Sequence, residues 1–299
     1  MLQFAIMKII KPLQAAAIKL LLRVLVWLPF RVVQAIGKGL GWCAFWLPSS
    51  VKKVAQYNIA LCFPELTPEE RCLLLRQAFM ETFCTFFEWP ALWLWPAAKR
   101  ITLMKAVQGE DILFEALHEQ RGVIIAMPHL GAWEAIKCYA PSHYKGLVMY
   151  RPPRLQELHS FMLQAREHEG SWRLVPANTA GVKAMFRTLK QGGIVIILPD
   201  QVPHQQGVIA PFFGVPASTI DLVQRLSQKT GARILYQYIE RLGVGRGFHL
   251  HFEAASPLLA DADPLIAVQA LNEGIEKCVR KIPAQYQWFY KRFKKNITH

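Results

Sequence analysis

A histidine and a glutamate five residues apart are the side chains of this 299-residue sequence best suited to chemistry. His129 follows the apolar run at 122–127, and both residues lie in the stretch PHLGAWE. In one helix their side chains would lie about 140° apart, so they can meet only if His129 lies in a loop and Glu134 in a first helical turn. A carboxylate that holds one imidazole nitrogen leaves the other free to accept a proton. The pair therefore predicts a general base, with Glu134 orienting His129. The alternative is a helix-capping histidine beside a solvated glutamate.

The elements that must position these residues follow from the hydrophobic pattern. Short apolar, β-branched runs predict buried strands at 122–127, 146–150, 193–198 and 233–239. Helical patterns lie at 132–140, 155–168, 179–191, 219–230 and 265–281. Strands that alternate with helices predict an α/β fold with a mixed, largely parallel central sheet flanked by helices. In such a sheet, functional residues lie at the carboxyl ends of strands.

Two local signals add to this pattern. Thr67 and Glu70 form a capping box that predicts a helix running toward Trp95. The glycines of GVGRG at 243–247 predict a hairpin turn, because no helix follows them as a dinucleotide-binding loop would require.

The basic residues of the chain are unevenly distributed. The net charge is +14, and residues 1–64 contain eight Lys and Arg but no Asp or Glu. On a helical wheel the basic residues between 8 and 23 lie opposite a Leu and Val face, a pattern typical of a helix lying on anionic lipid. A tilted membrane span and an ordinary core helix are the competing interpretations. We predict a membrane-anchoring helical segment at 1–50 and a second domain at 51–299. No nucleic-acid partner is expected, because large aliphatic residues separate the basic ones.

Aromatic residues and cysteines give two further expectations. The ring-dense stretch at 83–96 predicts side chains at the headgroup boundary of a membrane, with a buried helix as the alternative. The six cysteines lack CxxC spacing, so we expect buried, reduced thiols and neither a structural metal nor a cofactor.

Further segments accompany PHLGAWE in order along the chain. They are NIALCFPEL at 58–66, MYRPPR at 149–154, LKQGGIVIILPDQ at 189–201, PFFGVPAST at 211–219, RLSQKTGARIL at 225–235 and QYQWFYKRFK at 285–294. Together they resemble the bacterial lipid A biosynthesis acyltransferases, which carry a His-x4-Asp/Glu motif. The resemblance extends over nearly the whole chain.

The resemblance implies transfer of a fatty acyl chain from an acyl carrier protein thioester to a hydroxyl of a lipid A precursor or related membrane glycolipid. It places the catalytic domain at 51–299 on the cytoplasmic side of the bacterial inner membrane. His129 would take the proton of the acceptor hydroxyl, Glu134 would stabilise the imidazolium, and N–H groups near Gly131 would hold the oxyanion. Arg151 and Arg166 would bind an acceptor phosphate through a bidentate fork, and Asp200 would line the site.

Other interpretations of the same residues remain open. A lipase or thioesterase would use the same dyad with water as the acceptor, and a non-enzymatic protein would only bind membrane lipid. The cluster Lys291, Arg292, Lys294 and Lys295 is a candidate docking patch for acidic acyl carrier protein, with a solvated tail as the alternative. Phe212 and Phe213 would contact the acyl chain or pack in the core.

Overall fold

The computed structural model describes residues 2–139, 146–152, 156–167, 172–202 and 207–293, and within these ranges it describes side chains from residue 14 onward except that of residue 156. The N-terminal part is helical: α1 (Leu2–Leu25), α2 (Phe30–Trp46), α3 (Ser50–Cys62), α4 (Pro68–Leu94) and α5 (Ala97–Ile101). The remaining helices are α6 (Glu110–His118), η1 (Trp133–Cys138), η2 (Gln156–Leu158), α8 (His159–Glu167), α9 (Thr179–Lys190), α10 (Leu222–Thr230), η3 (Pro257–Ala260), α11 (Pro264–Lys281) and η4 (Pro283–Gln285).

Seven strands form the central sheet in the order β1-β9-β8-β2-β5-β3-β4. Their bounds are β1 (Met104–Gln108), β2 (Val123–Ala126), β3 (Gly146–Tyr150), β4 (Trp172–Pro176), β5 (Ile194–Ile197), β8 (Arg233–Arg241) and β9 (Phe248–Ala254). Neighbouring strands are parallel except β8 and β9, which pair antiparallel. A separate hairpin consists of β6 (Val208–Phe212) and β7 (Val215–Thr219). The predicted α/β fold with a mixed, largely parallel sheet is confirmed.

The core lies on both faces of the sheet, because successive side chains of a strand point to opposite sides. In β2, Ile124 joins the apolar cluster under α9, α10 and α11, while Val123 and Ile125 join the cluster under α6, η1 and α8. A strand buried on both faces has an unbroken apolar sequence instead of an alternating one. That is why β2 and β5, in which every residue is buried, were recognisable from the sequence.

The sequence patterns missed three strands of the central sheet: β1, β4 and β9. β1 has no buried side chain, and β9 is antiparallel to its neighbour β8. The capping box at Thr67 and Glu70 is confirmed at the start of α4, and the predicted hairpin turn joins β8 to β9. The helix expected at 132–140 is a shorter 3₁₀ helix, η1.

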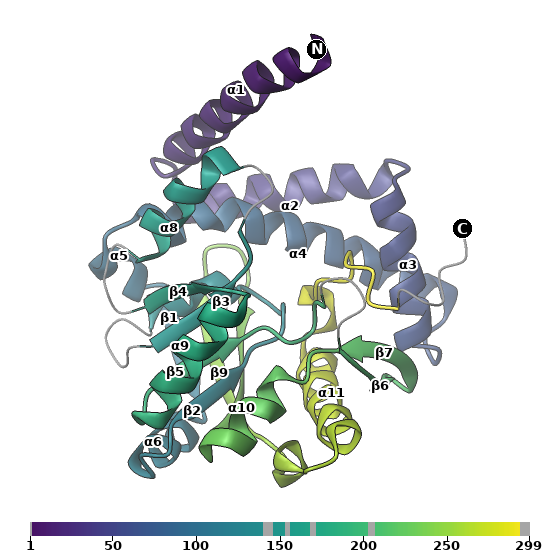
Figure 1. The fold of residues 1–299 in the computed structure, drawn as a ribbon. Coiled ribbons are helices and arrows are strands. Elements are labelled where there is room, and N and C mark those ends of the chain that lie inside the picture. The colour runs from purple at the N-terminus through teal and green to yellow at the C-terminus, as the bar shows by residue number, and fades with distance from the viewer. Residues whose placement is uncertain (1, 140–145, 153–155, 168–171, 203–206, 294–299) are drawn as a thin grey trace.

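The N-terminal helices lie along one side of the molecule, with α1 projecting from the body and α2 lying against α4 (Figure 1). Gly37 and Gly41 make that close contact possible: a Cβ on Gly41 would lie 2.6 Å from the Phe79 carbonyl oxygen. A buried ion pair ties this layer to the sheet. Arg241 at the end of β8 donates to Glu88 of α4 at 2.6 Å, and Gln34 of α2 donates to the same carboxylate.

Two expectations about the N-terminal half are corrected here. Trp93 and Trp95 are buried, so this part of the aromatic stretch belongs to the core and not to a headgroup boundary. Cys43 and Cys72 are exposed, whereas the other four cysteines are buried as expected. Among the described helices, none has both the length and the apolar character needed to cross a bilayer.

Candidate active site

The site forms where two neighbouring parallel strands end. In the register of β2 and β5, Ala126 pairs with Ile197, the last residue of each strand. His129 and Asp200 each lie three residues beyond that pair, and the two residues are therefore neighbours at this edge of the sheet. His129 Nδ1 lies 2.8 Å from Asp200 Oδ1, and the His129 backbone N–H donates to Asp200 Oδ2 at 3.0 Å. One carboxylate therefore holds both the ring and the main chain of His129.

Asp200 is buried, with 1% of its side chain exposed. Burial alone would raise the pKa of this carboxyl, but the His129 ring, its hydrogen bonds and the Arg292 guanidinium act in the opposite direction and hold the pKa below its ordinary value. Asp200 is therefore ionised at neutral pH. An ionised carboxylate accepts hydrogen bonds only, which places the His129 proton on Nδ1 and leaves a lone pair on Nε2.

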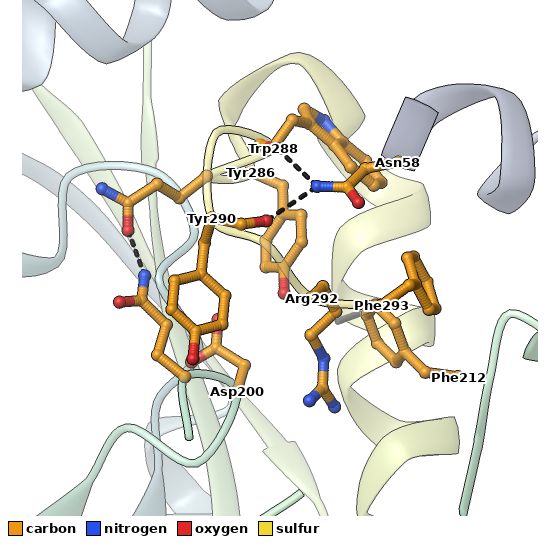
Figure 2. A pocket seen from close by; sticks show the side chains of 10 residues that line it. Asn58, Asp200, Phe212, Tyr286, Trp288, Tyr290, Arg292 and Phe293 are labelled. Atoms are coloured by element: carbon orange, nitrogen blue, oxygen red, sulfur yellow. Dashed lines mark hydrogen bonds between the residues drawn. The ribbon is translucent and has the colours of Figure 1, made fainter. Parts of the chain in front are cut away.

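Residues of the C-terminal segment, among them Tyr286 and Tyr290, lie around Asp200 (Figure 2). The Tyr286 hydroxyl hydrogen-bonds Asp200, and burial together with the Asp200 charge raises the pKa of that hydroxyl well above its ordinary value. Asn58 of α3 donates to the backbone carbonyls of Trp288 at 2.6 Å and Tyr290 at 2.8 Å. Residues of the segments 58–66 and 285–293, far apart in the sequence, thus meet beside Asp200.

Glu134 is placed differently from the expectation. Its carboxylate accepts from Trp93 Nε1 at 2.8 Å and forms an ion pair with Arg166 of α8. The Arg166 guanidinium also lies over the Trp93 ring, 5.0 Å from its centroid. Because both Glu134 oxygens are engaged this way and His129 Nδ1 is held by Asp200, the predicted His129–Glu134 contact is wrong. Glu134 and Arg166 form a second, separate pair in the same site.

His129, Glu134 and Arg166 line one cavity of about 380 Å³, and Asp200 is buried behind His129. The cavity wall is mostly apolar, with side chains that include Met127, Trp133, Val148, Met162, Trp172 and Leu174. His129, Glu134, Arg151 and Arg166 contribute polar groups. A largely apolar cleft with a few converging polar groups is typical of a small-molecule site, and it would accept an extended hydrocarbon chain.

Comparison with known proteins shows the family to which the chain belongs. The family model of the bacterial lipid A biosynthesis acyltransferases matches residues 10–295. The chain belongs to this family. It is 28% identical to the lipid A biosynthesis lauroyltransferase of Escherichia coli K12 over 276 residues, which cover 90% of this chain and 87% of the relative.

Two other relatives are similar over nearly the same share of the chain. The lipid A biosynthesis palmitoleoyltransferase of Escherichia coli K12 is 28% identical, with 90% of this chain and 87% of the relative covered. A lipid A biosynthesis acyltransferase of Haemophilus influenzae is 24% identical, with 91% and 87% covered. Family membership identifies the chain as an acyltransferase acting in lipid A synthesis, which confirms the resemblance drawn from the motifs.

The remaining predicted residues of the acyltransferase are placed as follows. Arg151 is exposed at the cavity, and its guanidinium has no ion-pair partner among the described residues. Gly131 adopts φ +66° and lies so close to β8 that a Cβ would lie 1.9 Å from the Ile239 oxygen. Its N–H donates to the Gln285 carbonyl at 2.9 Å, and the Ala132 N–H donates to Ile239. These amides are engaged within the protein, so we do not assign them to the oxyanion.

Two further expectations concern residues outside the cavity. Phe212 and Phe213 are buried, and they pack against Tyr286, Phe63 and Trp288 instead of lining the cavity. Arg292 is buried too and donates to Thr219 Oγ1 at 2.5 Å, so it is not part of a docking patch. Lys294 and Lys295 lie outside the described residues.

Sequence reasoning missed Trp93, Tyr286 and the partnership of His129 with Asp200. One signal was available for the last of these. Both residues follow an apolar strand at the same interval, and adjacent parallel strands align such residues at one edge of the sheet. No pattern in the sequence indicated which strands are neighbours.

Proposed function

We propose that this acyltransferase moves a fatty acyl chain from an acyl carrier protein thioester to a hydroxyl of a lipid A precursor or closely related glycolipid. The observation that carries the proposal is the His129–Asp200 pair at the wall of a largely apolar cavity. An apolar cavity suits the acyl chain, and an imidazole with a free nitrogen suits a hydroxyl nucleophile.

The order of proton transfers follows from the tautomer of His129, in which Nδ1 carries the proton that Asp200 accepts as a hydrogen bond. His129 Nε2 accepts the proton of the acceptor hydroxyl while the hydroxyl oxygen attacks the thioester carbonyl carbon. When the tetrahedral intermediate collapses, the carbon–sulfur bond breaks, the ester forms, and the imidazolium returns the proton to the leaving thiolate. Asp200 stabilises the imidazolium through both steps, as an aspartate does in a Ser-His-Asp triad.

Glu134 takes a different role in this proposal. It anchors Arg166 beside Trp93, and the pair shapes the polar end of the cavity instead of orienting His129. Arg151, which is exposed and has no ion-pair partner among the described residues, is better placed to receive a phosphate of the acceptor. A guanidinium binds phosphate through two parallel hydrogen bonds.

The N-terminal helices support a location at the inner membrane, with the site on its cytoplasmic side. Large apolar side chains of this region are exposed, among them Leu20, Trp27 and Trp46 at 64%, 88% and 61%. They accompany basic residues such as Lys19 and Arg23 without a neighbouring acidic residue in the sequence. Exposed Trp and Leu beside Lys and Arg are typical of a segment that binds an anionic lipid surface.

A transfer assay with the purified full-length chain tests the proposal. The same acyl chain is supplied on acyl carrier protein or on coenzyme A, with and without a lipid A precursor, and products are identified by mass spectrometry. We expect acylated lipid from the carrier-protein donor, and its loss by about 10²–10⁴-fold in His129→Ala. His118→Ala removes an exposed histidine on α6 and serves as the control. Equal release of free fatty acid with and without the lipid would instead identify a thioesterase.

A further inference from the structure

Glu240, His249 and His251 gather on one face of the sheet, in the ladder between β8 and β9. The antiparallel register pairs Glu240 with His249 and Tyr238 with His251, and the two histidines share a face because they are two residues apart. One ligand atom from each of the three residues lies within 4.8 Å of the other two. Within the part of the chain that the structure describes, no other three His, Cys, Asp or Glu side chains meet this condition. None of the three lines the acyltransferase cavity.

The His251 ring has an acceptor at each nitrogen. Nδ1 lies 3.1 Å from the Gln108 amide oxygen and Nε2 lies 3.2 Å from Glu240 Oε2. An amide oxygen only accepts, so the proton of a neutral ring lies on Nδ1 and the Nε2 lone pair faces a carboxylate. Two acceptors facing each other repel unless a proton or a cation lies between them.

The surroundings hold the three ligands and leave the site open to water. Tyr238 stacks on the His251 ring with centroids 4.5 Å apart and planes 5° apart. Lys281, the cationic side chain beside this face, is paired with Glu253 and so leaves Glu240 available. His251 is buried, whereas His249 and Glu240 are half-buried.

We propose that Glu240, His249 and His251 bind a divalent transition metal ion of the zinc class. Zinc takes imidazole nitrogen and carboxylate oxygen at about 2.0–2.2 Å, which in a tetrahedron separates the ligand atoms by about 3.3–3.6 Å. The 3.2 Å between His251 and Glu240 is close to that separation. Three protein ligands with water in the fourth position form a known type of zinc site. Gln108 supplies the outer hydrogen bond that ligating histidines make through their second nitrogen.

The role of the ion in this proposal is structural and separate from acyl transfer. It would link β8 to β9, the only antiparallel pair in the described central sheet. The proposal therefore does not depend on the donor, the acceptor or the His129–Asp200 pair.

Metal binding to the full-length chain, freed of any purification tag and treated with chelator, tests the site. Zn²⁺ is titrated by equilibrium dialysis with elemental analysis, and Co²⁺ is used as a visible-absorption probe of tetrahedral coordination. We expect one equivalent of Zn²⁺ per chain and a Zn²⁺-dependent rise of the unfolding temperature. His249→Ala and Glu240→Gln should each weaken binding by more than about tenfold, and Gln108→Ala by about 10–100-fold.

Two sets of controls make the outcome decisive. His118→Ala removes a histidine from an exposed helix and should leave binding unchanged. Cys43→Ser with Cys72→Ser removes the two exposed thiols, since a thiolate also binds zinc. A variant that is less stable without metal still reports on the site through its response to Zn²⁺. Absence of stoichiometric binding, or binding lost with the cysteines and kept in His249→Ala, would overturn the proposal.

Discussion

At the scale of residues, the chemistry depends on which carboxylate holds the imidazole of His129. Two carboxylates lie in the site, and their surroundings differ. Asp200 is buried, is ionised and contacts both the ring and the backbone of His129. Glu134 is engaged by Trp93 and Arg166. The site therefore contains two hydrogen-bonded pairs, to which the proposed function gives different tasks: proton transfer for one and shaping the cavity for the other.

Kinetics of paired variants separates these tasks. We expect Asp200→Asn to lower kcat by about 10²–10⁴-fold, because Asn would no longer hold the correct tautomer of His129. Glu134→Gln and Arg166→Gln should each reduce activity, and their double variant should be no worse than either, since they act as a unit. The effects of Asp200→Asn and Glu134→Gln should multiply. An unchanged kcat in Asp200→Asn would contradict the assignment of Asp200 as the residue that orients His129. Asp111→Asn, at the exposed start of α6, is the control.

The depressed pKa of Asp200 also predicts a pH dependence of stability. A carboxyl with a lower pKa in the folded state stabilises the fold above its unfolded pKa of about 3.9, and that contribution disappears as the pH falls through the folded value. The difference in unfolding free energy between the wild type and Asp200→Asn should therefore shrink as the pH is lowered from about 6 to about 3. Urea denaturation at several pH values measures it. A difference that stays constant over this range would contradict the ionised, His129-paired state of Asp200.

At the scale of elements, the contact between α2 and α4 depends on glycines spaced four residues apart. A Cβ atom on Gly37 would lie 2.9 Å from Cys84 Cα, and one on Gly41 would lie 2.6 Å from the Phe79 carbonyl oxygen. Backbone atoms cannot move aside as a flexible side chain can, so the helices would have to separate. This contact also supports the active site, since α4 carries Trp93 and the Glu88 partner of Arg241.

Two glycine substitutions in the same helix test this packing. Gly41→Ala should destabilise the protein by about 1–3 kcal/mol through overpacking. Gly39 is exposed and has open space around its Cβ position, so Gly39→Ala should be neutral or should stabilise the helix by up to about 1 kcal/mol. Thermal or chemical denaturation measures both. Equal effects of the two substitutions would show that helix propensity, and not the contact with α4, determines the outcome.

At the scale of the whole molecule, exposed apolar side chains are concentrated on the N-terminal helices. We expect Leu20→Ser together with Trp27→Ser to weaken binding to anionic vesicles by more than about tenfold, because these side chains would lose their apolar contact with lipid. Vesicle sedimentation measures the binding. The control is Leu258→Ser together with Leu265→Ser. Both leucines are exposed, but they lie in η3 and at the start of α11, away from the N-terminal helices. Equal losses in both pairs would contradict a membrane-binding surface on the N-terminal helices.

The sequence by itself determined the central strands, the capping box of α4 and the family. β2 and β5 were readable because both of their faces are buried, which makes their sequence continuously apolar. The family was readable because its motifs occur in order along nearly the whole chain. His129 was identified for the same reason, and so was the presence of Glu134, Arg166 and Asp200 in the site.

Only the tertiary structure decided how these residues are paired. His129 and Asp200 are separated by 71 positions and meet because β2 lies next to β5, and strand order is a property of the packed sheet. Glu134 lies only five positions from His129, but its carboxylate turns to Trp93 of α4 and Arg166 of α8. Short spacing in the sequence suggests a contact, but it does not decide which groups pair. Burying a charged carboxylate costs free energy unless a cation or hydrogen-bond donors contact it, so a buried carboxylate pairs with the groups that packing places beside it.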